Sequence, residues 1–168
     1  MSGKQSVFLL MLLGLLPAFV LAAAETPSPL APFFEKTGDA GIPVAAWLAR
    51  DGTARVDVYS SGKVTRFAFD RGGKPTSSPS PAAYDTKVLE GLKFSAADAC
   101  SQAAARNDPD GAEIRAVTLR VDKSGASFAA AAYDRNGKFL GTHLFSAETG
   151  QWQGWVDAVG EKDPLETG

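Results

Sequence analysis

Closely spaced turns constrain this fold more than any other feature of the sequence. Short segments rich in β-branched, aromatic and alanine residues alternate with glycine-containing turns such as Asp51-Gly52, Ser61-Gly62 and Asn136-Gly137. Strands joined by turns this short pair as antiparallel neighbours, because a parallel pair needs a long crossover connection. The expected strands cover residues 43–50, 53–60, 63–70, 113–122, 126–134, 138–145 and 151–157.

Apolar and polar residues alternate along several of these segments. One polar residue separates Val56 from Val58, and the same spacing relates Val117, Leu119 and Val121. A period of two places alternate side chains on one face of a strand. We therefore expect two antiparallel meanders, each with an apolar face.

The best helix candidate covers residues 95–106. Ser95 is a favoured N-cap residue, and Asp98 suits the positive end of the helix dipole. The segment is dense in alanine, and the turn-forming residues 107–111 end it. A weaker helical stretch covers residues 84–92. Helical spacing gives one face that should pack on the second meander, made of Phe94, Ala97, Cys100 and Ala104.

The N-terminal residues are typical of an export signal. Lys4 is the only charge before Glu25, and an apolar run over residues 7–21 leads to three alanines at 22–24. This order describes a signal peptide that is cleaved after the alanines. The apolar run is shorter than the roughly 20 residues of a spanning helix and contains Pro17. We expect a periplasmic or secreted domain with no stable membrane anchor after cleavage.

Two proline-rich segments divide the rest of the chain, which is long enough for one domain with its own core. The expected class is α+β, with antiparallel meanders, helices on one face and two tandem helix-plus-sheet units. The segments are a signal peptide (1–24), a loose leader (25–32), a first, degenerate sheet unit (33–75), a Pro/Ser-rich linker (76–83), a helix-plus-meander unit (84–157) and a C-terminal tail (158–168).

Composition narrows the classes of partner. The formal net charge is −2, and acidic and basic residues are mixed along the chain. A chain without a basic block has no electrostatic footprint for nucleic acid or for an anionic membrane. We therefore expect a protein partner and no nucleic acid.

The sequence lacks a recognisable set of catalytic or metal-binding residues. Cys100 is the only cysteine and His143 the only histidine, and no Gly-x-Ser-x-Gly segment accompanies them. A thiol–imidazole pair is one interpretation; a buried thiol and an imidazole on the sheet surface is the one we favour. The acidic residues of 107–113 are interrupted by Pro109, which favours a solvated turn over a calcium loop. We expect no catalytic residue, no metal and no cofactor.

Aromatic residues provide the functional hint. Tryptophan and tyrosine often anchor binding surfaces, although burial in the core is the competing explanation. Trp152 and Trp155 should point to opposite faces of a strand because three positions separate them. The sheet face away from the helices should carry no helix, and such a face is either polar or a docking surface. The candidate binding residues are Tyr133, Trp155, Trp47 and Tyr59.

Three motifs follow one another in the second half of the chain. FSAADA at residues 94–99 opens the helix, DRNGK at 134–138 forms a hairpin turn, and FSAETGQW at 145–152 follows the next strand. This order resembles the PepSY family of exported bacterial domains. The first half looks like a degenerate copy, with residues 30–37 at the place of the helix, and paired units of this kind resemble the β-lactamase-inhibitor fold. Gly141 and the run of small residues at 129–132 depart from this pattern.

The resemblance implies a non-enzymatic domain that restrains peptidases or binds at the cell envelope. We therefore expect an exported binding or inhibitory module whose partner is a peptidase or another envelope protein. The alternatives are a structural protein that assembles with itself through a sheet edge and a small enzyme that uses Cys100 or His143. The sequence names neither the partner nor the oligomeric state.

Overall fold

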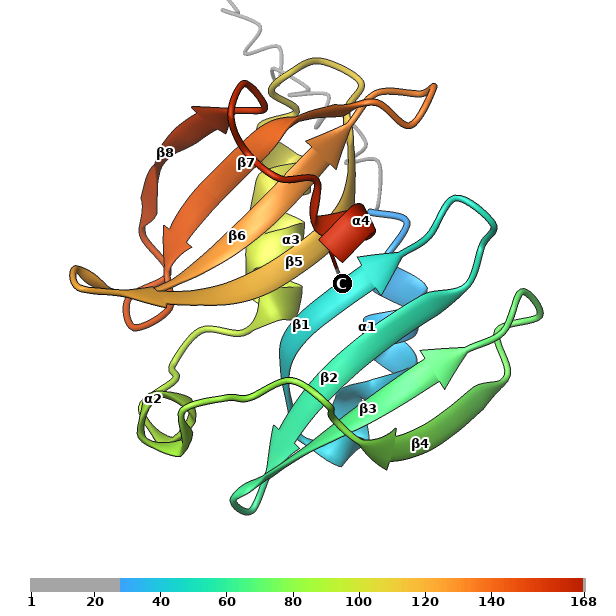
Figure 1. The fold of residues 1–168 in the computed structure, drawn as a ribbon, viewed down its shortest axis with the longest axis vertical. Helices are drawn as coiled ribbons and strands as arrows, with labels where there is room; N and C mark the ends of the chain where they lie inside the picture. The colour runs from blue at the N-terminus through green and yellow to red at the C-terminus, as the bar shows by residue number, and fades with distance from the viewer. Residues whose placement is uncertain (1–27, 168) are drawn as a thin grey trace, which may run out of the picture.

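The computed structural model describes residues 28–167, and Figure 1 shows their arrangement. The predicted signal peptide and its cleavage site lie outside the described residues. None of the helices in the described part is long and apolar enough to cross a membrane. The elements are helices α1 (Ala31–Thr37), α2 (Thr86–Glu90), α3 (Ala96–Arg106) and α4 (Pro164–Thr167), the 3-10 helix η1 (Gly38–Ala40), and strands β1 (Ile42–Leu48), β2 (Ala54–Ser60), β3 (Lys63–Phe69), β4 (Pro75–Pro79), β5 (Glu113–Asp122), β6 (Gly125–Tyr133), β7 (Phe139–Ser146) and β8 (Trp152–Asp157).

The eight strands of the described residues form one antiparallel sheet in the order β4-β3-β2-β1-β5-β6-β7-β8. The α+β class and the two predicted meanders are confirmed. The meanders meet where β1 pairs with β5, and this ladder has only two registered pairs, Ala46 with Val117 and Trp47 with Ala116. Every other ladder joins strands that follow each other in the sequence.

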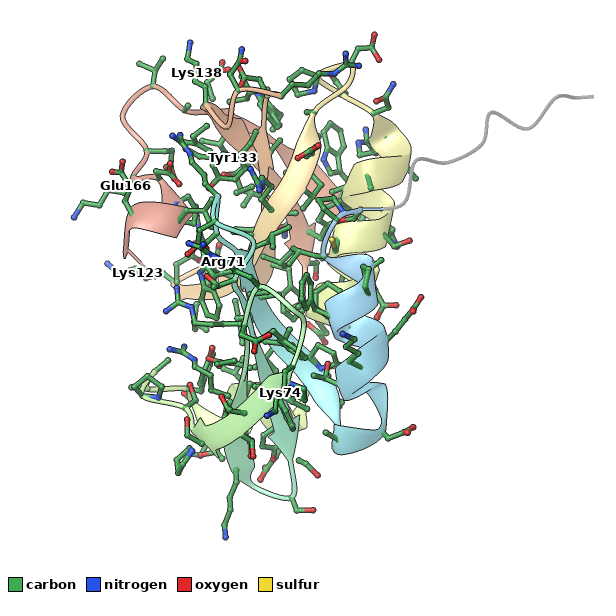
Figure 2. The ribbon with its side chains drawn as sticks, turned by 90° about the vertical axis from the view of Figure 1, so that its right-hand side faces the viewer. Arg71, Lys74, Lys123, Tyr133, Lys138 and Glu166 are labelled. Atoms are coloured by element: carbon green, nitrogen blue, oxygen red, sulfur yellow. The ribbon has the colours of Figure 1, made fainter. Side chains whose placement is uncertain are left out.

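Helices α1 and α3 lie on the same face of the sheet, as Figure 2 shows from the side. Ser95 caps α3 and forms a capping box with Asp98, while Asn107 ends the helix in the left-handed conformation. The buried face of α3 differs from the prediction: Ala97 and Ala104 are only partly buried. Alanine occurs all around this helix, so spacing alone did not identify its inner face. The buried residues of α3 are Ala96, Ala99, Cys100 and Ala103.

Of the three alternating residues of β5, two lie against the helix-covered core. Val117 is fully buried and Leu119 packs at the edge of the core. The prediction is wrong for Val121, whose side chain is 55% exposed. The burial pattern of β5 shows the reason, because the strand leaves the core over its last residues and ends in solvent.

Two glycines of the second meander are required by close packing. Only glycine fits at position 141 of β7, where φ is +150°. A Cβ atom there would collide with the Trp155 indole and the Val156 carbonyl oxygen. A Cβ atom on Gly150 would lie 2.7 Å from the Phe94 ring. The glycine that interrupts the alternation of β7 is therefore part of the contact between β7 and β8.

Three segments expected to be irregular are ordered parts of the fold. In the leader, Leu30 is fully buried and the Ser28 hydroxyl donates to the Ile114 carbonyl oxygen at 3.2 Å. The expected linker contributes most of β4, which pairs with β3 at the edge of the sheet. The expected tail contains α4, which lies on the face opposite α1 and α3 (Figure 2), so this face does carry a helix.

Candidate functional site

We call the sheet face away from α1 and α3 the open face. The segment 158–165 crosses its second half and is held by three polar contacts and one apolar contact. The Ala158 amide donates to the Leu140 carbonyl oxygen at 3.1 Å. Arg120 Nη1 lies 3.3 Å from a Glu161 carboxylate oxygen. The chain thus covers this half of its own sheet.

Tyr133 lies beneath this segment, so the expectation that it is exposed is wrong. Its side chain is 0% exposed, and its hydroxyl donates to Asp163 Oδ1 at 2.6 Å. Burial and the adjacent carboxylate both raise the pKa of the Tyr133 phenol. Leu165 packs against a small cluster that contains Tyr133 and Trp47. Tyr133 therefore fastens the C-terminal segment to the sheet.

Trp155 and Trp152 both lie on the helix side of the sheet, contrary to the prediction of opposite faces. The register between β7 and β8 shifts by one residue beside Leu144, which places both indoles on one side. Trp155 packs against the core and meets His143 edge-on, with ring centroids 4.7 Å apart. Trp152 stacks on the guanidinium of Arg106 from α3.

Trp47 occupies the centre of the open face at the seam between β1 and β5. Its side chain is 8% exposed, and two guanidinium groups lie over its ring: Arg55 at 5.3 Å and Arg66 at 5.2 Å from the centroid. Trp47 on β1 pairs in register with Arg55 on β2. Tyr59 lies four residues after Arg55 on β2, and because side chains alternate along a strand it points to the same face as Arg55. Trp47 and a half-buried Tyr59 are thus the predicted aromatics that lie on the open face outside the part covered by the C-terminal segment.

A buried carboxylate beside Trp47 organises the first half of the open face. Asp57 is fully buried and pairs in register with Arg66, which donates to both of its oxygens at 2.7 and 2.9 Å. Ser80 and Tyr84 donate their hydroxyls to the same carboxylate at 2.8 and 2.7 Å. Burial and the carboxylate raise the pKa of Tyr84. This network was not predicted, although Asp57 and Arg66 flank a short hairpin at cross-strand spacing.

Arg55 differs from Arg66 because nothing in the described part of the chain accepts a hydrogen bond from it or forms an ion pair with it. Its guanidinium is half-buried on the Trp47 ring. Burial lowers the pKa of Arg55, and the neighbouring Arg66 lowers it further, against a smaller opposing effect of Asp57. Within residues 28–167, Arg55 is therefore a cation held on the Trp47 ring whose N–H groups have no acceptor.

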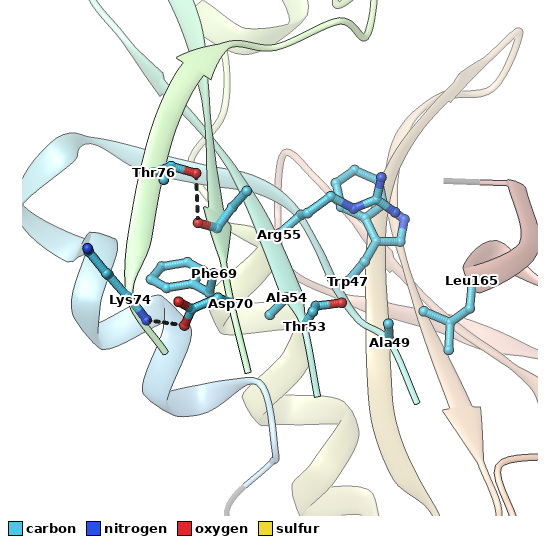
Figure 3. Close-up of a pocket in the computed structure, with 11 residues that line it drawn as sticks. Trp47, Ala49, Thr53, Ala54, Arg55, Phe69, Asp70, Lys74, Thr76 and Leu165 are labelled. Carbon is cyan, nitrogen blue, oxygen red and sulfur yellow. Dashed lines mark hydrogen bonds between the residues drawn. The ribbon is translucent and has the colours of Figure 1, made fainter. Parts of the chain in front are cut away.

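Trp47 borders three hollows of the protein surface. The first, of about 560 Å³, is shown in Figure 3 and lies between Arg55, Phe69, Thr76 and Leu165. The second, of about 470 Å³, runs beside the C-terminal segment. The third, of about 480 Å³, lies where β1 and β5 diverge and is closed by residues 81–85. These hollows meet at one indole, so the open face is hollowed around Trp47.

Cys100 and His143 have separate environments. Cys100 is buried, as predicted; burial raises its pKa to about 11, and its Sγ lies 3.0 Å from Ser28 Oγ. His143 is buried rather than on the sheet surface, because Trp155 and the loop after α3 cover it. Its Nε2 lies 2.6 Å from the Asp108 carbonyl oxygen, to which it donates. No hydrogen bond joins Cys100 to His143 in the described structure.

The acidic turn after α3 satisfies its own polar groups. The Asn107 amide donates to Asp110 at 2.8 Å, and the Gly111 N–H donates to the Asn107 side-chain oxygen at 3.1 Å. Over residues 28–167, no group of three or more His, Cys, Asp and Glu side chains is placed to hold a metal ion. These residues form a hydrogen-bonded turn, as the sequence favoured.

Comparison with models of protein families, with curated proteins and with solved structures gives no match to this chain.

Proposed function

We propose that this chain is an exported, non-enzymatic binding module that engages a protein partner through the open face around Trp47. The observation that carries this proposal is the half of the open face that the C-terminal segment leaves uncovered. There an indole and a guanidinium that finds no acceptor within residues 28–167 lie beside the first and third hollows. Tryptophan and arginine are the residue types that most often dominate the binding energy of protein interfaces.

The chemistry of the open face supports binding better than catalysis. Asp57 accepts four hydrogen bonds, so its carboxylate is committed to the structure. A nucleophile needs a base within hydrogen-bond reach, and the described residues around Trp47 present no such pair. The thiol of Cys100 and the imidazole of His143 are both buried on the helix side.

The order of the elements supports the tandem arrangement and the resemblance to PepSY domains as parts of this proposal. A helix precedes each run of four strands, α1 before β1–β4 and α3 before β5–β8. In this interpretation the two units share one sheet, and the partner is a peptidase or another protein of the cell envelope. Export through the N-terminal segment would bring the module to that compartment.

A pair of neighbouring substitutions on β4 tests the proposal. Thr76 is exposed and lines the first hollow, whereas Ser77, the next residue of the strand, points to the other face. Thr76→Trp should fill the hollow and abolish capture of the partner from an envelope extract, while Ser77→Trp should leave it unchanged. Equal capture by both variants would place the interface elsewhere, and recovery of this chain alone would favour self-assembly.

A further inference from the structure

We infer that the hollow beside Trp47 and Arg55 receives a side-chain carboxylate of the partner, so that the open face selects an aspartate or glutamate. This inference rests on the proposed function, because it names the chemistry of the residue that a protein partner would insert. It concerns the first hollow alone, which is shown in Figure 3.

Two arginines on neighbouring strands differ in the acceptors that the chain gives them. Arg66 donates to both oxygens of Asp57 and is thereby satisfied. Arg55 shares the Trp47 ring with Arg66 but has no acceptor among residues 28–167. The cluster holds two guanidinium groups and one carboxylate, so one further carboxylate would balance it. A half-buried guanidinium without a protein acceptor keeps N–H groups that can donate to a ligand oxygen in charge-assisted hydrogen bonds.

The geometry of Arg55 suits a carboxylate in particular. A guanidinium presents parallel N–H groups that match the two oxygens of a carboxylate. In the structure the Arg55 guanidinium lies over the Trp47 ring, with Cζ 5.3 Å from the centroid (Figure 3). Burial and the neighbouring Arg66 lower the pKa of Arg55, and the smaller opposing effect of Asp57 offsets them only in part.

The walls of the hollow favour a protein side chain over a small dianion or a chain terminus. Ala68 and Leu165 supply apolar surface for the methylene groups of an acidic side chain, which a small dianion lacks, and Asp70 and Lys74 add one charge of each sign to the lining. Chain-terminal carboxylates are commonly captured by runs of backbone N–H groups. Here the Thr53 and Lys74 amides already donate to Asp51 and Asp70.

Titrations with blocked amino acids test the inference without knowledge of the partner. The probes are N-acetyl-glutamate amide and its neutral analogue N-acetyl-glutamine amide, followed through the NMR signals of the Trp47 indole N–H and the Arg55 Nε–H. The carboxylate probe should shift both signals and bind at least about tenfold more tightly than the neutral probe, since charge-assisted hydrogen bonds are lost in the latter. Arg55→Gln should remove this preference.

The matched control is Arg71→Gln, which removes the same charge from an exposed arginine outside the lining of the hollow. It should keep the preference for the carboxylate probe. Equal binding of the two probes, an unchanged preference in Arg55→Gln or no shift of the Trp47 signal would overturn the inference. Tighter binding of inorganic phosphate or of N-acetyl-alanine, which offers only a terminal carboxylate, would overturn it as well.

The two proposals fail in different ways. If the carboxylate preference is absent but Thr76→Trp still abolishes capture, the open face binds its partner through other chemistry. If the preference is present but no partner depends on Thr76, the hollow recognises a carboxylate while the proposed interface is wrong.

Discussion

The two halves of the open face differ in what covers them. Over β5–β7 the sheet carries small residues and Tyr133, and the chain's own segment 158–165 closes that half through Asp163 and Leu165. Over β1–β4 the sheet carries Trp47 and charged residues; residues 80–85 cross this half beside Asp57, where Ser80 and Tyr84 bind the carboxylate, and leave the hollow beside Arg55 open. The difference shows that a sheet face can be stabilised by a polar network of its own side chains when no helix or terminal segment covers it. One half is completed within the chain, and the other is stabilised by a polar network that leaves Arg55 available.

Removal of the Asp57 carboxylate should disrupt the polar network over β1–β4. It should have the largest effect on stability of the substitutions considered. Asp57→Ala leaves Arg66, Ser80 and Tyr84 without their common acceptor. Breaking a buried ion pair from one side costs about 3–5 kcal/mol of unfolding free energy. Urea denaturation measures the loss, with Glu90→Ala at an exposed position as the control. Similar midpoints for the two variants would show that the network does not hold this half together.

Removal of one hydroxyl should loosen the covered half with a smaller loss of stability. Tyr133→Phe deletes the hydrogen bond to Asp163 and should lower the unfolding free energy by about 1–2 kcal/mol. Amide hydrogen exchange over residues 158–165 should accelerate, while exchange in β1–β4 should not. Tyr59→Phe is the control, because no hydrogen bond of the Tyr59 hydroxyl occurs within the described residues. Unchanged exchange in Tyr133→Phe would mean that other contacts hold the segment.

Mild acid should destabilise the half that contains His143 on β7, with the smallest of the three losses of stability. Burial lowers the pKa of His143 below 6.5, its usual value, so the unfolded chain binds this proton at a higher pH than the folded chain does. The stability from the neutral imidazole is complete above about pH 6.5 and is lost as the pH falls through that value toward the folded pKa. His143→Gln should flatten this part of the pH profile of the urea midpoint. A profile identical to that of the parent chain would assign the acid sensitivity to other groups.

Much of the fold is predictable because its signals are local. Turn residues and alternation identify every strand of both meanders except β4, and Ser95 and Asp98 identify the start of α3. β4 was not predicted because its sequence, PTSSP, is typical of a linker. Its strand conformation comes from pairing with β3. The buried face of α3 was not predicted correctly because alanine occurs on all sides of this helix.

The candidate site is less predictable because it depends on contacts across strands. Trp47 was predicted from residue type alone, and its partner Arg55 could be found only once the register of β1 and β2 was known. Tyr133 and Trp155 were assigned to a binding surface by the same reasoning. A C-terminal segment covers the first, and a register shift in β8 turns the second inward. Tertiary contacts therefore decided which aromatic side chains remain accessible.

The short ladder between β1 and β5 has a consequence for the order of folding. All other strand pairs close small loops, whereas this pair must bring together segments separated by three strands and two helices. The entropy of loop closure rises with the length of chain enclosed, and long-range pairing slows folding. We expect each run of hairpins to form early and the junction at Trp47 to close last. The centre of the open face would then be completed only when the whole chain has folded.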